Sequence, residues 1–164
     1  METTRHFTAT VYIVNGGKTA LHHHDRLDMW LPPGGHLDRD ELPRDGARRE
    51  VEEETGLTVT LRESETAVEA PTVTELAGPE YLLLEDIHRY QDGTVGHQHI
   101  DFVYFGSVPS RQIDPDADER ERTHWEWFDD EALTADPGLA PEVEQIGREA
   151  IARLDRRDME DSDD

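Results

Sequence analysis

Residues 34–57, GGHLDRDELPRDGARREVEEETGL, are the stretch around which the chain is organised. A Pro-Pro-Gly-Gly turn at residues 32–35 leads into it, and the pattern then predicts a helix from about Arg44 to Thr55. Gly56 is expected to end the helix, because glycine readily takes the left-handed conformation of a C-terminal cap. The sequence therefore predicts a turn, a helix and a sharp stop.

Three glutamates share one stripe of this helix. Glu50 is three residues before Glu53 and four before Glu54, so the carboxylates lie on one face. Ala47 and Val51 form the neighbouring apolar stripe, which is expected to face the core. Like charges at this spacing repel, and Mg²⁺ and Mn²⁺ prefer such oxygen ligands. The alternative is a solvated acidic face in an acid-rich chain.

The full spacing favours the metal site over a solvated face, because it resembles the Nudix box at each defined position. The matching positions are Gly35, five residues, Glu41, seven residues, Arg49-Glu50-Val51, one residue, Glu53-Glu54, one residue, and Gly56-Leu57. The resemblance to Nudix hydrolases implies an α+β protein with the Nudix fold, an α/β/α sandwich with a mixed β-sheet. A chain of 164 residues is long enough for one such domain, expected over residues 1–157. The acidic residues 158–164 are expected to be a disordered tail.

The resemblance also implies a reaction. Water attacks a phosphorus atom and cleaves the pyrophosphate bond of a nucleoside diphosphate linked to another moiety. Mg²⁺ or Mn²⁺ is the implied cofactor, held by Glu50, Glu53 and Glu54, with the carbonyl of Gly34 or Gly35 as a further ligand.

Other box residues have supporting or undecided roles. The catalytic set is expected to be Glu50, Glu53 and Arg49, with Glu50 either a further ligand or the general base. Arg49 is adjacent to Glu50 and four residues before Glu53, so the sequence leaves open which carboxylate it orients. Glu41 is expected to be structural or a minor ligand.

Substrate contacts are expected outside the box, and an ordinary structural role is the alternative for these candidates. Trp30 is a candidate for stacking on a base, although packing is its commoner role. His99 and Asp101 share a strand face with His97 and are candidates for substrate or metal contact. Glu119, with Glu121 nearby, lies in a charged loop that offers a base or ligand, or is only solvated. The tract His22–His24 places two imidazoles on one face, where we expect no structural metal.

One residue outside the box bears on the substrate class. Pro71 lies fifteen residues after Gly56, an offset that resembles ADP-ribose-hydrolysing members. ADP-ribose or another nucleoside-diphosphate sugar is therefore placed slightly ahead of a (deoxy)nucleoside triphosphate. A non-catalytic nucleotide-sensing module is the alternative of another class, and the complete box argues against it.

The charge of the chain limits its partners. The formal net charge is −23, from 39 acidic and 16 basic residues, which argues against a basic nucleic-acid surface. Salt screens such repulsion, with a Debye length of about 3 Å at 1 M, so a halophilic, high-salt host is favoured over a merely GC-rich genome. No apolar run is long enough to span a membrane, and a cytoplasmic location is expected. The oligomeric state stays open, a homodimer included.

Alternating apolar residues predict the strands. Residues 6–14 are expected to be a strand with one strongly buried side, turning at Asn15-Gly16-Gly17 into a returning strand. Further strands are expected near residues 29–31, 57–62, 80–89, 97–108 and 125–128. Residues 141–157 predict an amphipathic helix, and residues 63–79 give no clear pattern.

Overall fold

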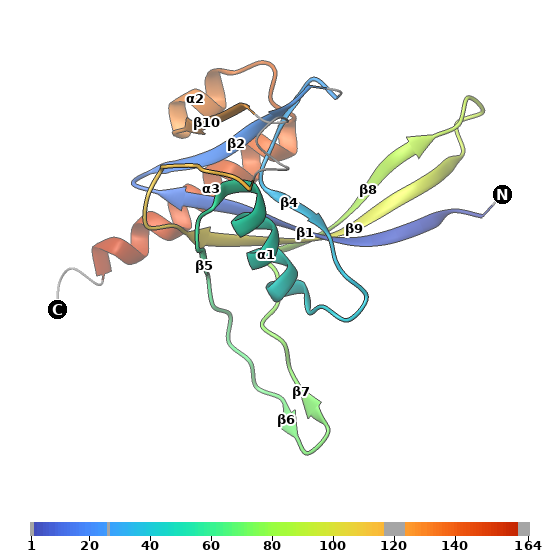
Figure 1. Ribbon diagram of the computed structural model, residues 1–164, viewed down its shortest axis with the longest axis horizontal. Coiled ribbons are helices and arrows are strands. Elements are labelled where there is room, and N and C mark those ends of the chain that lie inside the picture. Colours follow the sequence, from blue (N-terminus) through green and yellow to red (C-terminus); the bar gives the residue numbers. More distant parts are fainter. Residues whose placement is uncertain (1, 26, 117–123, 161–164) are drawn as a thin grey trace.

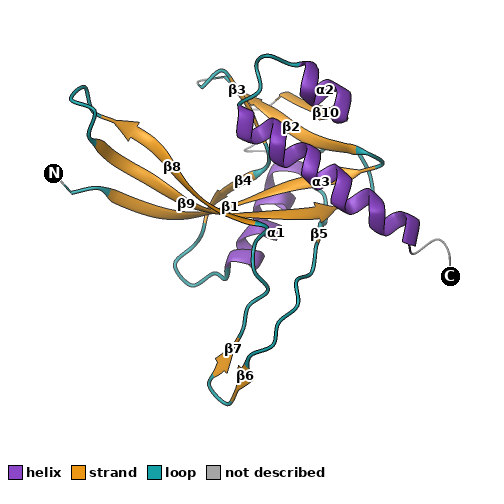
Figure 2. Cartoon of the chain, turned by 180° about the vertical axis from the view of Figure 1, so that it is seen from behind, coloured by secondary structure: helices purple, strands orange, loops and turns teal. Residues whose placement is uncertain are grey.

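The computed structural model describes residues 2–25, 27–116 and 124–160, the last six without their side chains. Most strands form one eight-stranded sheet, and helices α1 and α3 lie against its opposite faces (Figures 1 and 2). The α/β/α sandwich expected from the sequence is confirmed. Its elements are β1 (Thr4–Asn15), β2 (Lys18–His24), β3 (Met29–Leu31), β4 (Gly34–His36), α1 (Pro43–Thr55), β5 (Thr60–Leu61), β6 (Glu69–Ala70), β7 (Val73–Thr74), β8 (Tyr81–Arg89), β9 (Val95–Ser107), β10 (His124–Phe128), α2 (Asp130–Ala135) and α3 (Pro141–Glu160).

The sheet is mixed, with β1 near its centre. The main path runs β10-β2-β1-β9-β5, while β3, β4 and β8 pair with β2, β1 and β9 respectively. β1 and β9 are parallel over a long register that begins at Thr4 opposite His97. The other paired strands of this sheet are antiparallel. Two strands distant in sequence therefore form the spine of the fold.

The strand expected over residues 6–14 is confirmed, and the side that carries Ala9, Val11 and Ile13 is buried, but the opposite side is buried as well. From Val11 to Val14 successive side chains are all buried, while Phe7 on the supposed inner face is 55% exposed. The reason is that β1 passes between two cores, one under each helix. Ala9, Val11 and Ile13 pack toward α1, and Tyr12 and Val14 pack toward α3.

The hairpin turn at Asn15-Gly16-Gly17 and the Gly56 cap are confirmed, whereas the turn expected at residues 32–35 is limited to residues 32–33, because Gly34 and Gly35 pair with β1 as part of β4. Gly16 and Gly17 have positive φ angles of 54° and 75° and join β1 to β2 as a hairpin. Gly56 caps α1 with φ 68°, and its N–H donates to the carbonyl of Glu52 at 2.8 Å. Helix α1 begins at Pro43, one residue before the expected start, which suits a residue without a backbone donor.

Three segments differ from the sequence expectation. β5 is limited to residues 60–61 rather than 57–62. Residues 69–74 form a small hairpin, β6–β7, that projects from the body of the molecule (Figure 1). α3 continues to Glu160, beyond the domain boundary expected at residue 157, and residues 161–164 lie outside the described part. None of the described helices is long and apolar enough to cross a membrane.

Candidate functional site

The site begins where β4 attaches to β1. Gly35 pairs with Ala9 and His36 with Thr8, so the short strand is fixed on one side of the central strand. The chain then loops through Glu41 into α1, which packs on the same part of the sheet. The two glycines of β4 and the glutamate stripe predicted from the sequence are thereby brought together.

Arg49 contacts three carboxylates. Its Nε and Nη2 donate to the two oxygens of Glu41 at 2.8 and 3.0 Å. Its Nη1 donates to Oε1 of Glu50 at 2.9 Å and to Oε2 of Glu53 at 3.0 Å. Nη2 also donates to the carbonyl of His36 at 3.0 Å. The sequence left open whether Arg49 holds Glu50 or Glu53, and in the structure it contacts both.

The pKa shifts follow from this arrangement. The hydrogen bonds from Arg49 lower the pKa of the Glu41 carboxyl, and Glu41 in turn raises the pKa of Arg49. Burial raises the pKa of Glu50, against the opposing effect of Arg49. One guanidinium thus faces three carboxylates, which leaves an excess of negative charge around the stripe.

Two glycines make room for these contacts. A Cβ atom on Gly35 would lie 2.5 Å from Oε1 of Glu50, and one on Gly46 would lie 2.8 Å from Oε2 of Glu41. Gly35 was singled out from the box spacing, but Gly46 was missed. The available signal was a glycine inside a predicted helix, where it is unfavourable without a packing reason.

The donor set fits a hard divalent cation. Arg49 contacts one oxygen of Glu50 and one of Glu53, and their second oxygens, Oε2 and Oε1, make no contact with it. Glu54 lies at the same turn, where its Oε2 accepts from the N–H of Gly34 at 3.3 Å. Carboxylate oxygens are the ligands that Mg²⁺ and Mn²⁺ prefer, and these three glutamates share one face of α1.

The C-terminal end of α1 leads toward the charged loop. The N–H of Asp114 donates to the carbonyl of Thr55 at 2.9 Å, and that of Asp116 donates to the carbonyl of Glu53 at 3.0 Å. Glu119 and Glu121, named as candidates from the sequence, lie outside the described residues. Glu119 therefore stays a prediction.

The comparison with protein families decides the relationship. The family model of the NUDIX domain matches residues 4–154. The chain belongs to the Nudix hydrolase family. A Nudix-family hydrolase from Clostridium perfringens has 30% sequence identity and a TM-score of 0.77, over 92% of this chain and 99% of that one.

Two further Nudix relatives differ in what their names say. An RNA pyrophosphohydrolase from Bartonella tribocorum is 31% identical over 111 residues, 66% of this chain and 61% of that protein's length. The structure of a UDP-X diphosphatase matches with a TM-score of 0.58 and 18% identity, over 95% of this chain and 65% of that one. The second likeness shows the Nudix fold alone.

His99 and Asp101 lie away from the Nudix glutamates. They extend from β9 on the face that also carries Thr8 and Tyr12, opposite the face covered by α1. Asp101 is 3% exposed, accepts a hydrogen bond from Thr8 at 2.8 Å, and has its pKa raised by burial. The sheet therefore separates these two candidates from the Nudix glutamates.

The aromatic candidates are packed. Trp30 lies against the α3-side core, with its ring 5.1 Å from that of Phe128 and 5.3 Å from that of His23. Trp125 lies 4.9 Å from the ring of His22, which is itself buried. The packing role given as the alternative for Trp30 matches this environment, and Trp125 is packed in the same way.

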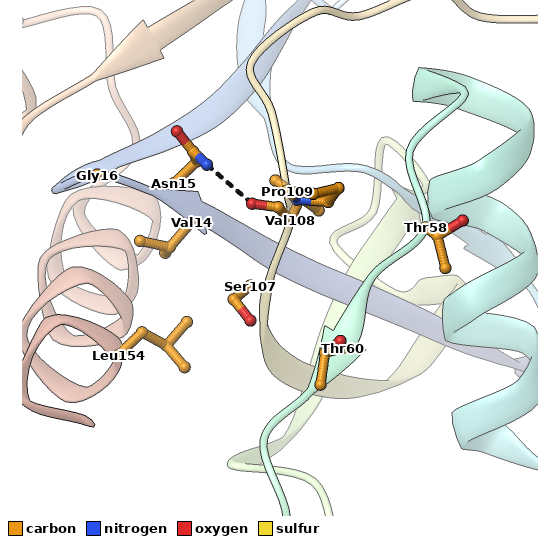
Figure 3. A pocket seen from close by; sticks show the side chains of 9 residues that line it. All are labelled: Val14, Asn15, Gly16, Thr58, Thr60, Ser107, Val108, Pro109 and Leu154. Atoms are coloured by element: carbon orange, nitrogen blue, oxygen red, sulfur yellow. Dashed lines mark hydrogen bonds between the residues drawn. The ribbon is translucent and has the colours of Figure 1, made fainter. Parts of the chain in front are cut away.

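A hollow of about 510 Å³ lies elsewhere, between the β1–β2 turn, β5 and the end of β9 (Figure 3). Asn15 crosses one side of it and donates to the carbonyl of Val108 at 2.8 Å. Its lining has no acidic or basic side chain and none of the Nudix box residues. It lacks the groups that phosphate chemistry requires.

Proposed function

We propose that this protein hydrolyses the pyrophosphate bond of a small nucleotide, a nucleoside diphosphate linked to another moiety, with Mg²⁺ or Mn²⁺ as cofactor. The observation that carries the proposal is the contact of Arg49 with Glu41, Glu50 and Glu53 on the helix of a complete Nudix box. Glu53 and Glu54 would hold the metal, with Glu50 either a further ligand or the general base, and with the carbonyl of Gly34 or Gly35 as a further candidate ligand. The bound ion would neutralise phosphate oxygens and lower the pKa of a water molecule.

The remaining roles in the reaction are assigned to side chains of the protein. Water forms a bond to one phosphorus atom, the bridging P–O bond breaks, and the phosphate on the far side leaves with the bridging oxygen. Glu50 is the candidate to accept the proton of that water, because its carboxylate lies against Gly35 and is oriented by Arg49. Glu41 acts as a positioning residue, since it reaches the site through Arg49.

A nucleoside-diphosphate sugar such as ADP-ribose stays slightly ahead of a nucleoside triphosphate as the substrate. The support from Pro71 is small, because this residue lies in the exposed β6–β7 hairpin that projects from the body (Figure 1). The relative named RNA pyrophosphohydrolase makes the 5′ end of RNA a second candidate. The net charge of −23 disfavours a long polyanion over a small nucleotide.

The test compares two glutamates of the same helix. We expect Glu53→Gln to lower metal-dependent turnover on the order of 100-fold or more, while Glu52→Gln, an exposed neighbour, changes it little. Turnover is measured by chromatography with ADP-ribose, triphosphates and 5′-triphosphorylated RNA, at low salt and in molar KCl. Full activity of Glu53→Gln would remove the proposed role of that residue. Binding of nucleotide by a folded protein that cleaves none of them would instead indicate a sensing module.

A further inference from the structure

Four histidines from three strands gather on the sheet face opposite α1. His6 comes from β1, His36 from β4, and His97 and His99 from β9. The register explains the cluster: His6 lies opposite His99, and His36 lies opposite Thr8, the next residue on the same face as His6. Each ring offers one nitrogen, and these nitrogens all lie within 4.8 Å of one another.

We propose that His6, His36, His97 and His99 form a second metal site, for a borderline transition-metal ion such as Zn²⁺. Imidazole nitrogens suit Zn²⁺, Cu²⁺, Ni²⁺ and Fe²⁺, whereas Mg²⁺ selects oxygen ligands. This site has four nitrogens and no carboxylate, so its chemistry is opposite to that of the glutamate stripe. The proposal does not depend on the reaction of the Nudix box.

The four nitrogens are nearly close enough together to share one ion. Zn–N bonds of 2.0–2.1 Å place the nitrogens of a tetrahedral site roughly 3.3–3.4 Å apart, so the rings must turn inward by about an ångström. They have room to do so, because His6 and His36 are exposed and the other two are half-buried. Ring centroids 4.6 Å apart for His6 and His97 and 4.8 Å apart for His36 and His99 show that the rings already converge.

Two further observations favour a metal ligand over a chance cluster. The hydroxyl of Thr4 lies 2.9 Å from Nδ1 of His97, and in the tautomer with the proton on Nδ1 this contact orients the ring and leaves Nε2 for a metal. The ring nitrogens of His6, His36 and His99 make no hydrogen bond to another described residue.

The bound ion would hold β4, the strand at the start of the Nudix box, against its neighbouring strands. His36 directly follows Gly35, and its carbonyl accepts the hydrogen bond from Nη2 of Arg49. An ion bound to its ring would tie β4 to β1 and β9 from the opposite face. Metal binding is therefore expected to raise the Tm with the logarithm of the metal concentration once that concentration exceeds the Kd.

The test uses the untagged full chain, stripped with a chelator and kept in excess Mg²⁺ so that the glutamates are occupied. We expect one Zn²⁺ to bind per chain with a rise in Tm, and Co²⁺ to give the intense visible absorption of a tetrahedral complex. The double variant H6N/H97N should lose at least about 100-fold in Zn²⁺ affinity. The H24N variant, altered in the other histidine tract, should bind as the parent does.

Several results would overturn the proposal. Absence of Zn²⁺ binding, or binding lost in E53Q but kept in H6N/H97N, would show that no ion uses the imidazoles. Loss in H24N would place the ion on the tract of residues 22–24 instead. Far-UV circular dichroism checks that each variant is folded, and the single variant H6Q serves if the double variant is not.

Discussion

Arg49 and Glu41 pair through two parallel hydrogen bonds, from Nε to Oε1 at 2.8 Å and from Nη2 to Oε2 at 3.0 Å. This fork-to-fork geometry is among the stronger pairings available to side chains. Glu41 precedes the helix and Arg49 lies within it, so the pair fixes the loop to α1. It also orients Nη1 toward Glu50 and Glu53.

The first prediction concerns Glu41. Glu41→Gln removes the charge and one of the two acceptors, so we expect the free energy of unfolding to fall by about 1–2 kcal/mol. Turnover should fall about tenfold, because Arg49 then orients Glu50 and Glu53 less well. Denaturant unfolding and steady-state kinetics measure the two effects.

Arg48 provides the control for this prediction. It pairs with Asp45 at 3.2 Å on the exposed side of the same helix, where an ion pair contributes about 0–1 kcal/mol. Arg48→Gln should therefore change stability and turnover little. Equal effects of the Glu41 and Arg48 substitutions would contradict a special role for the Glu41–Arg49 pair.

The second prediction concerns the close approach at Gly35. Gly35→Ala would place a Cβ atom 2.5 Å from Oε1 of Glu50, so the carboxylate must move away from the turn. We expect turnover to fall at least about tenfold, because a small misplacement of a reacting group is costly. Gly78→Ala is the matched control, since a Cβ atom there meets nothing within 4 Å. Unchanged kinetics of Gly35→Ala would mean that Glu50 needs no such fixed position.

The third prediction concerns pH. Burial, followed by the charges of Asp101 and Glu142, raises the pKa of Glu85 from its ordinary value of 4.5 to about 7. Between these values the folded protein binds more protons than the unfolded chain, so this group makes the free energy of unfolding fall as pH rises toward 7. Glu85→Gln should therefore be more stable than the parent above pH 7. The gain is on the order of 1–2 kcal/mol after allowing for partial exposure.

The comparison is made by denaturant unfolding at pH 4.5 and pH 8. The gain from Glu85→Gln should nearly vanish at the lower pH, where the parent carboxyl is protonated in the folded state. The contribution of His22 to stability has the opposite pH dependence. Burial lowers its pKa to about 4, so on acidification the unfolded chain binds a proton before the folded protein does, and the free energy of unfolding falls. His22 is present in both the parent and the Glu85→Gln variant, so its contribution cancels in the comparison. The exposed Glu65→Gln serves as control, and a gain that is equal at both pH values would contradict the explanation.

The fourth prediction concerns salt. A net charge of −23 opposes the compact state by self-repulsion, and salt screens that repulsion. We expect the Tm to rise between about 0.05 M and 1 M KCl, where the Debye length falls to about 3 Å. A Tm that falls over this range would show that local pairs such as Arg49–Glu41 outweigh the net repulsion.

The box was predictable because its residues act through helical spacing. Positions 50, 53 and 54 share a helix face in any α-helix, and glycine at position 56 suits the cap found there. Neither inference needs knowledge of distant contacts. The same holds for the Gly16–Gly17 hairpin turn, which local backbone preference decides.

The remainder depends on pairings between distant segments. Phe7 and Val11 lie on the same face of β1, because an even number of residues separates their positions. Only the placement of the two helices explains why Phe7 is exposed and Val11 is buried. Of the histidine cluster, the sequence placed only His97 and His99 on one face, because the rest requires His6 of β1 and His36 of β4 to lie beside β9. The local sequence pattern does not determine which residues of β1, β4 and β9 lie opposite one another.

The parallel pairing of β1 with β9 has a consequence for synthesis of the chain. Residues that pair between the two strands, such as Thr4 and His97, are separated by 93 positions along the chain. The ribosome must therefore produce well over half of the protein before the central strand can acquire that neighbour. Contacts of such long sequence separation slow folding. Until β9 emerges, the apolar residues of β1 remain open to chaperones, and fragments ending before β9 should not reach the native state.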